Sequence, residues 1–176
     1  MDREVVGQSV RFIALIFLQV LILNNVLFSN LFNPYLYIYF ILLLPVDFRP
    51  SLGLIVGFFL GLSIDIFSQT LGMHAIATTF AAYCRPYVLT YMAPRDGYEF
   101  SRNPGVRQMG WLWFSTYAGI IIALHHFVLF FVEMFRMSGL WQTLLKSLCS
   151  SILTLILVLI IQLIFLRSNR SNSSYE

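Results

Sequence analysis

The stretch that decides the fold class is SLGLIVGFFLGLSIDIF, residues 51–67, in which Asp65 is the one charged side chain. A run of this length and composition can cross the hydrocarbon core of a bilayer as one helix. The rest of the chain agrees, because hydrophobic residues make up 59% of it and charged residues 11%, whereas soluble domains hold roughly 25% charged residues. We therefore predict an all-α integral membrane protein with a single transmembrane domain over residues 1–166.

Apolar runs separated by short polar segments predict six membrane spans. The predicted spans are residues 12–29, 34–47, 51–67, 71–92, 111–135 and 142–166. The Ser/Asn-rich residues 167–176 are predicted to form a disordered cytoplasmic tail. The runs 34–47 and 51–67 are short enough for a re-entrant hairpin instead. The tip of that hairpin would place Asp47 and Arg49 in hydrocarbon, at about 2.5–3.5 kcal/mol for each charge, so two short spans are preferred.

The basic residues predict the orientation of the spans. With the N-terminus in the cytoplasm, the basic residues on the inner side are Arg3, Arg11, Arg49, Arg85, Arg95, Arg102, Arg107, Arg167 and Arg170. Arg85 lies within a span and is expected to snorkel towards the inner surface. Only Arg136 and Lys146 fall near the outer side. Because cytoplasmic segments are enriched in Lys and Arg, we predict that both termini and residues 94–110 are cytoplasmic.

Tyrosine and tryptophan residues cluster near the ends of predicted spans, where such side chains anchor a helix at the lipid–water interface. They are Tyr35, Tyr37, Tyr39, Trp111, Trp113 and Trp141. We prefer this interpretation, and stacking on a ligand is the alternative.

Three glycines, Gly53, Gly57 and Gly61, follow one another at intervals of four residues. Glycines at this spacing lie on one side of a helix and let a neighbouring backbone approach closely. Packing within the chain is the preferred interpretation. A groove for a transmembrane helix of a partner protein is the alternative.

Asp65 is the most informative single residue, because an intramembrane carboxylate is a functional candidate by default. It lies near the outer end of its span, where the helix dipole disfavours a negative charge. Backbone amides near Gly72 to Ala75, at the start of the next span, are suitable donors, and the His74 side chain is another. A structural tie between the two spans is preferred over proton or ion transport.

His125 and His126 lie near the middle of their predicted span. Adjacent residues point about 100° apart on a helix, so we expect that the two side chains do not face one site. Buried, hydrogen-bonded histidines are preferred over a proton relay. Glu133, further along this span, is expected to pair with Arg136.

Other polar residues are interpreted as structural. Amide side chains that we expect to hold helices together are Gln19, Asn24, Asn25 and Gln162. Cys84 and Cys149 lie in apolar runs, without the spacing of a metal site or a disulfide framework. No hydrolase, metalloprotease or P-loop motif is present, and a net charge of +3 without a continuous basic patch does not suggest nucleic acid. We predict no enzyme activity, cofactor, metal or nucleic-acid partner.

Residues 44–50, followed by 53–65 and by Leu71 and Gly72, resemble the MreD family of bacterial rod-shape-determining membrane proteins. In that family a small-residue helix ends in an aspartate and is followed by a short Leu-Gly turn and another helix. The size, the six-span layout and the cytoplasmic termini are similar over nearly the whole chain. The resemblance implies that Gly57, Gly61, Asp65 and Gly72 are signature positions, without a catalytic role.

The resemblance also implies a function. Such a protein is a non-catalytic scaffold in the bacterial inner (plasma) membrane, surrounded by membrane lipid, in the cell-wall elongation complex that maintains cell shape. It binds an MreC-like protein, and through it MreB filaments and the wall synthases, and it is a candidate for homo-oligomer formation.

The layout is also similar to the S-component architecture of the substrate-binding subunits of energy-coupling-factor vitamin transporters. The alternative function is therefore a small-molecule-binding subunit with an outer pocket built from Asp65, His74 and Asn25. Against it, those subunits often show an A-x-x-x-A pattern in the first span, where this chain has only Ala14.

Overall fold

A computed structural model of the chain describes residues 3–25, 32–95, 97–98, 103–134 and 139–172. All regular structure in these residues is helical, which confirms the predicted all-α class. The long helices are α1 (Arg3–Phe17), α3 (Pro50–Ser68), α4 (Met73–Tyr91), α6 (Trp111–Met134) and α7 (Leu140–Asn172). The shorter elements are a π-helical turn Leu18–Ile22, 3-10 turns Leu23–Asn25 and Leu36–Ile38, α2 (Tyr39–Leu42) and α5 (Val106–Met109).

Four segments of the described residues are long and apolar enough to cross a membrane. They are Val6–Asn25, Pro50–Ser68, Trp111–Glu133 and Leu140–Leu166. The predicted count of six spans is thus not confirmed. The helix α4 is as long as α3, at 19 residues, but buried polar side chains such as His74, Thr78 and Arg85 reduce its apolar character.

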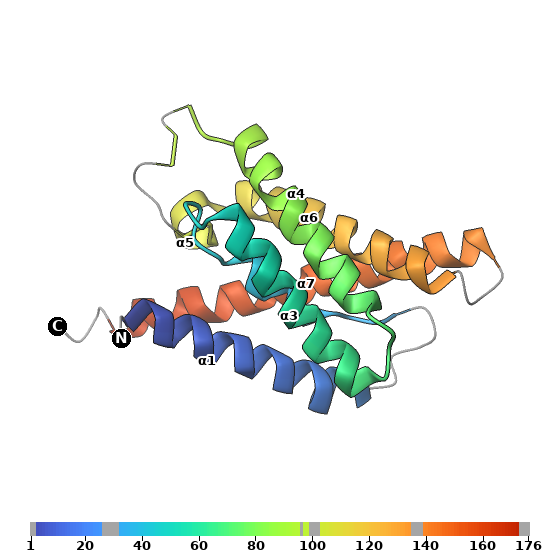
Figure 1. The fold of residues 1–176 in the computed structure, drawn as a ribbon. Helices are drawn as coiled ribbons and strands as arrows, with labels where there is room; N and C mark the ends of the chain where they lie inside the picture. The colour runs from blue at the N-terminus through green and yellow to red at the C-terminus, as the bar shows by residue number, and fades with distance from the viewer. Residues whose placement is uncertain (1–2, 26–31, 96, 99–102, 135–138, 173–176) are drawn as a thin grey trace.

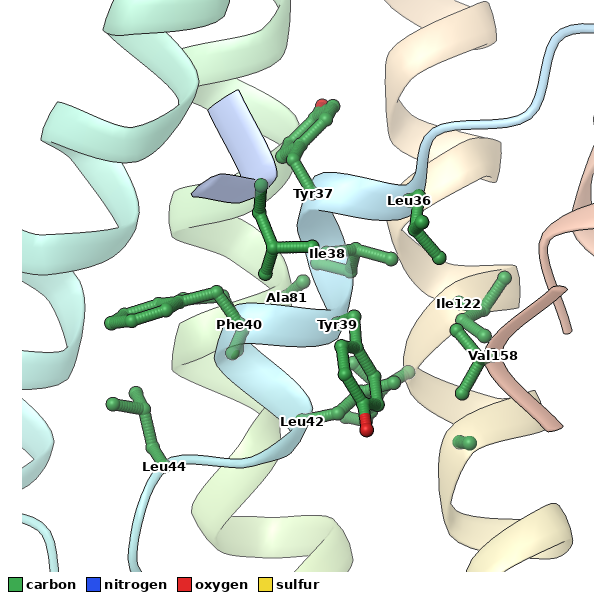
Figure 2. Close-up of a cluster of buried hydrophobic side chains, with 14 of the residues drawn as sticks. Leu36, Tyr37, Ile38, Tyr39, Phe40, Leu42, Leu44, Ala81, Ile122 and Val158 are labelled. Atoms are coloured by element: carbon green, nitrogen blue, oxygen red, sulfur yellow. The ribbon is translucent and has the colours of Figure 1, made fainter. Parts of the chain in front are cut away.

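Residues 34–47, predicted as a span, do not form a long helix. They contain only the 3-10 turn Leu36–Ile38 and α2, and every side chain from 36 to 42 is buried. Figure 2 shows this segment enclosed by the long helices, with Ala81, Ile122 and Val158 around it. Such irregular backbone is tolerated at membrane depth only where protein surrounds it. The segment therefore forms the core of the bundle instead of a lipid-facing span.

The long helices pack in sequence around this core. The helix α3 packs against α4, α4 against α6, and α6 against α7. Figure 1 shows the start of α1, the end of α7 and α5 at one end of the molecule, with the end of α6 and the start of α7 at the opposite end. The start of α3 lies at the same end as α5.

The last helix is longer than expected. The helix α7 continues to Asn172, into the segment 167–176 that we predicted as disordered, and residues 173–176 lie outside the described residues. Arg102 and Arg136, used in the orientation argument, also lie outside them. Trp111 and Trp141 are exposed, as interface anchors must be.

Candidate functional site

The glycine side of α3 is covered by α4 of the same chain. A Cβ atom on Gly61 would lie 2.5 Å from the Ala75 Cα atom, and one on Gly57 would lie 3.1 Å from the Ala82 Cβ atom. Both glycines are buried. The preferred interpretation, packing within the chain, therefore holds for these two positions, and no partner helix can occupy that side. Gly53 differs, because its Cβ would meet only Phe48, at 3.9 Å.

The Asp65 carboxylate ties the end of α3 to the start of α4. Its Oδ1 atom accepts hydrogen bonds from the Thr70 hydroxyl at 2.5 Å and from the His74 amide at 3.1 Å, and Oδ2 accepts one from the Ala75 amide at 2.9 Å. Gly72, the residue before α4, has a φ of 78° and no side chain that could cap the helix. Asp65 therefore supplies the cap from outside α4, through the amides that the sequence predicted.

The His74 side chain points to a different partner. Its Nδ1 atom lies 2.8 Å from the Tyr37 hydroxyl, and His125 Nε2 lies 2.7 Å from the same hydroxyl. Tyr37 is completely buried, so its predicted place at the lipid interface is wrong. A phenol has one hydrogen to donate, so one of the two rings must donate to the Tyr37 oxygen and the other must accept.

His126 lies beside His125 and bonds other groups. Its Nδ1 atom is 2.9 Å from the Ile122 carbonyl, so this nitrogen must carry the hydrogen, and its Nε2 atom is 3.1 Å from the Thr154 hydroxyl. The Thr154 oxygen also accepts from the Tyr35 amide at 3.1 Å. In a neutral His126 ring, Thr154 therefore donates its hydroxyl hydrogen to Nε2.

These partners assign the remaining hydrogens. His126 Nδ1 gives its one hydrogen to the Ile122 carbonyl, so His125 Nδ1, which lies 3.5 Å away, cannot donate a hydrogen to it. His125 then carries its hydrogen on Nε2 and donates to Tyr37, and Tyr37 donates to His74 Nδ1. All three rings are neutral in this arrangement.

We call the residues Tyr35, Tyr37, His74, His125, His126 and Thr154 the tyrosine–histidine cluster. The expectation that His125 and His126 do not share a site is wrong. They bond different neighbours, as their separation on the helix requires, but their ring centroids are 5.1 Å apart and Tyr35 packs against both rings. The Tyr35 ring centroid is 4.9 Å from that of His74 and 5.6 Å from that of His126. The prediction of buried, hydrogen-bonded histidines is confirmed.

Two of the predicted amides hold the buried segment in place. Gln19 accepts from the Leu36 amide at 2.8 Å and donates to the Pro34 carbonyl at 3.1 Å. Gln162 donates to the Tyr39 hydroxyl at 3.0 Å. Tyr39 is also buried, so its predicted position at the lipid–water interface is wrong. These amides join helices to the core segment, where irregular backbone groups need partners.

Asn24 and Asn25 act differently from each other. Asn24 donates to the Ser68 hydroxyl at 3.0 Å and so links the end of the first span to the end of α3. Asn25 donates to the carbonyls of Val20 and Leu21 in its own helix. The structure therefore does not bring Asn25 together with Asp65 and His74 around one pocket.

Arg85 is buried, with 5% of its surface exposed, and does not snorkel. Its Nε atom donates to the Tyr117 hydroxyl at 2.9 Å, and its Nη2 atom donates to the carbonyls of Leu44 and Pro45. The arginine thereby satisfies carbonyls that no helix uses at the end of the core segment. The burial of this cation was not predicted from the sequence.

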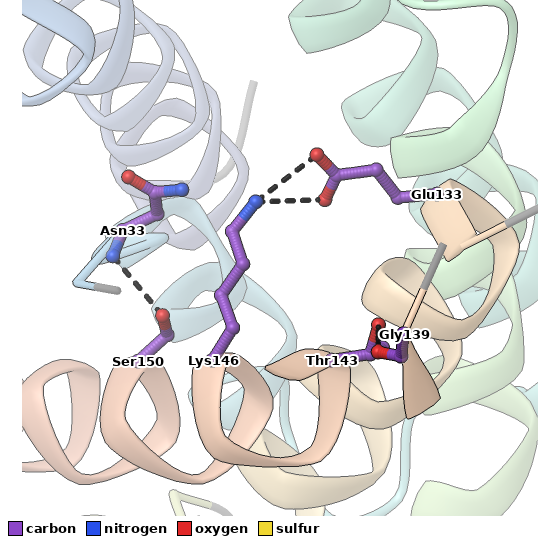
Figure 3. A network of polar contacts seen from close by, with 6 residues as sticks. All are labelled: Asn33, Glu133, Gly139, Thr143, Lys146 and Ser150. Atoms are coloured by element: carbon purple, nitrogen blue, oxygen red, sulfur yellow. Dashed lines mark hydrogen bonds and ion pairs between the residues drawn. The ribbon is translucent and has the colours of Figure 1, made fainter. Parts of the chain in front are cut away.

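Glu133, near the end of α6, and Lys146, near the start of α7, form an ion pair. Lys146 Nζ donates to both carboxylate oxygens of Glu133, at 3.0 and 3.1 Å, as Figure 3 shows. The same view shows the backbone N–H of Asn33 donating to the Ser150 hydroxyl at 3.0 Å. The predicted partner of Glu133, Arg136, lies outside the described residues. Lys146 joins α7 to α6 at this end.

The cluster has the features of a structural network. Among the described residues, every side-chain nitrogen and oxygen atom that is completely enclosed by protein has a hydrogen-bond partner. No group of three His, Cys, Asp or Glu side chains in that part of the chain could hold a metal ion. In the same residues, no carboxylate side chain bonds a ring nitrogen of the cluster. The arrangement therefore joins the core segment to α4, α6 and α7.

Comparison with known proteins adds no relative to these observations. No family model, no curated protein and no solved structure matches the chain. The likeness to the MreD family therefore rests on the residues of α3, the start of α4 and the segments next to them.

Proposed function

We propose that the protein is a non-catalytic component of the bacterial cell-wall elongation complex that binds an MreC-like protein in the inner membrane, with both termini in the cytoplasm. The main support is the α3–α4 pair. Of the signature positions implied by the resemblance, Gly57 and Gly61 allow α3 and α4 to pack closely, and Asp65 caps α4. Gly72 adopts the positive φ of the turn before α4. A rigid helix pair of this kind suits a scaffold.

The polar groups of the core support the same proposal. His74, His125 and Tyr37 bond one another, and Asp65 bonds α4. A catalytic or transport role would need such groups to meet a substrate, an ion or water, whereas here they satisfy the backbone and each other. We therefore assign them to stability of the scaffold.

The packing also constrains where the partner binds. The side of α3 that holds Gly57 and Gly61 is occupied by α4. The MreC-like protein must then contact another surface of the bundle. Substitutions in the glycine row would act on the partner only by disturbing the α3–α4 pair.

The proposal is tested in the native host. We expect that deletion of the gene makes rod-shaped cells round, and that the tagged protein co-purifies with the MreC-like protein from detergent-solubilised membranes. The variant Gly61→Leu should neither maintain rod shape nor co-purify with the MreC-like protein. The control Gly7→Ala, whose Cβ meets nothing within 4 Å, should do both. Rods of normal shape after deletion, together with no co-purification of the inserted wild-type protein, would contradict the proposal.

A small-molecule-binding subunit of a vitamin-type transporter is the second candidate. Its predicted pocket used Asp65, His74 and Asn25. Asp65 and His74 are occupied by other groups of the chain, and Asn25 bonds its own helix, so no structural observation favours this candidate. Native mass spectrometry of the purified protein discriminates the two, because a bound vitamin-sized molecule would support the transporter.

A further inference from the structure

A cavity of about 200 Å³ lies between the start of α3, the last turns of α4 and the segment that joins the core to α3. Its wall includes Asp47, Arg49, Gly53, Ala82 and Arg85. It lies at the end of the molecule where α3 begins, which also holds α5, the start of α1 and the end of α7 (Figure 1). The cavity is separate from the tyrosine–histidine cluster, because none of the cluster residues lines it.

Arg85 gives this cavity its chemical character. The guanidinium group is buried, and its hydrogen bonds go to the neutral oxygens of Tyr117, Leu44 and Pro45. Within the described part of the chain, its Nη1 atom makes no hydrogen bond and is not completely enclosed by protein. No carboxylate in that part of the chain lies within ion-pair distance of the guanidinium group. A buried cation is unfavourable unless an anion or many dipoles compensate it. Among the described residues, Arg85 therefore offers a positive charge that has no counter-ion.

The rim of the cavity adds charges of both signs. Arg49 and Asp47 are both exposed and line the same cavity. Asp47 opposes an anion, but the two arginines leave one net positive charge among these three side chains. The binding of an anion would place it between Arg49 at the rim and Arg85 at the wall.

The depth of the cavity indicates which anion is available. The 19 residues of α3 span about 28 Å at 1.5 Å per residue, which is close to the hydrocarbon thickness of a bilayer. The Pro50 end of α3 then lies at the level of the lipid headgroups. Guanidinium groups match the geometry of phosphate oxygens, and basic pockets between membrane helices bind anionic headgroups.

We propose that this cavity binds a phosphate group, held by Arg85 and Arg49, and that an anionic phospholipid supplies it. A soluble phosphate would use the same chemistry. The proposal does not depend on the MreC-like partner, because it concerns a different surface and a different class of ligand.

The test uses the full-length protein in detergent, washed free of co-purified lipid and titrated in native mass spectrometry. The probes are phosphatidylglycerol, phosphatidylcholine and inorganic phosphate. We expect phosphatidylglycerol to bind at least about tenfold more tightly than phosphatidylcholine. Replacing Arg85 by Gln should weaken that binding about tenfold or more, the loss expected for one charge-assisted hydrogen bond.

Two further variants keep the test valid if Arg85→Gln does not fold. Arg49→Gln removes the rim charge, and Gly53→Leu fills the cavity from a position where a Cβ atom has space. Each of these two variants should weaken the binding of phosphatidylglycerol by at least about threefold, which is the size of effect expected for losing an ion pair at an exposed site. The matched control is Arg107→Gln, an exposed arginine of α5 that does not line the cavity, and it should bind as the wild type does.

The outcomes separate the two sources of phosphate. Binding of phosphatidylglycerol that depends on Arg85, Arg49 and Gly53 supports the lipid. Binding of inorganic phosphate with the same dependence, and no binding of phosphatidylglycerol, supports the phosphate site with a soluble ligand. Equal binding by wild type and all variants, or equal binding of the two lipids, overturns the proposal.

Discussion

Asp65 takes the place of a capping side chain that α4 lacks, because Gly72 precedes the first turn of that helix. In Asp65→Asn, an NH₂ group replaces one carboxylate oxygen and faces a donor, either the Thr70 hydroxyl or a backbone amide of α4. We expect the free energy of unfolding to fall by about 1–3 kcal/mol. The measurement is denaturant unfolding in mixed micelles, followed by circular dichroism.

The control for this substitution lies on the same helix. Ser63 donates only to the Phe59 carbonyl of α3, so Ser63→Ala should change the stability by no more than about 0.5 kcal/mol. If Asp65→Asn is as stable as Ser63→Ala, the carboxylate does not cap α4 in the way described.

Tyr37 supports a second prediction, because its hydroxyl is shared by two histidine rings. Tyr37→Phe leaves His74 Nδ1 and His125 Nε2 buried without this partner. We expect a loss of about 2 kcal/mol or more in the free energy of unfolding. The matched control is Tyr87→Phe, since Tyr87 is exposed and bonds only Tyr83, at 3.4 Å. Equal stability of the two variants would show that the shared hydroxyl contributes nothing.

These two residues differ in how far the sequence predicts them. The partner of Asp65 was predictable, because its donors follow within ten positions and the direction of the helix dipole is known. The partners of Tyr37 are 37 and 88 positions away, and no local pattern encodes that distance. A tyrosine next to an apolar run also has the same appearance whether protein or lipid headgroups surround it.

At the scale of the helices, contact between α3 and α4 depends on the absence of side chains. In Gly61→Ala the new Cβ atom would approach the backbone of Ala75, which cannot move without shifting α4. We expect a loss of about 1–3 kcal/mol or more, as for other overpacked sites. The measurement is the same unfolding assay in micelles.

Gly53→Ala is the matched control on the same helix. Its Cβ atom meets only the Phe48 side chain at 3.9 Å, and alanine favours a helix over glycine by about 0.5–1 kcal/mol. The stability should therefore stay the same or rise. A larger loss at Gly53 than at Gly61 would contradict the described packing.

Residues 34–44 show why the elements could be predicted only in part. The helices α3, α4 and α6 begin and end within a few residues of the predicted spans, because lipid demands long apolar runs, whereas α7 continues past its predicted span to Asn172. The run at 34–47 is apolar for a different reason, namely that protein encloses it. Composition does not distinguish burial in protein from burial in lipid, so the short helical turns of this segment were not foreseen.

At the scale of the whole molecule, the ends of the bundle give a prediction about orientation. The background for this test has Cys84 and Cys149 replaced by serine. Single cysteines are then introduced at two exposed positions, Arg107→Cys in α5, before α6, and Leu140→Cys at the start of α7. In intact cells a membrane-impermeant thiol reagent should label Leu140→Cys and not Arg107→Cys. This is the outcome that the distribution of basic residues predicts.

Permeabilised cells provide the control for labelling, since both cysteines should then react. Labelling of Arg107→Cys in intact cells, with protection of Leu140→Cys, would reverse the orientation. It would also place the cavity beside Arg85 at the outer leaflet and remove the cytoplasmic placement on which the proposed scaffold role depends.

The enclosed segment also affects how the protein is made. Residues 34–44 leave the ribosome before α4, α6 and α7 exist, and their irregular backbone cannot remain in lipid alone. The amides of Asn33 and Tyr35 find their acceptors, Ser150 and Thr154, only after α7 has been synthesised. A chain that ends before Leu140 therefore leaves these two backbone amides without their acceptors. We expect membrane proteases to degrade such a truncated chain faster than the full-length protein.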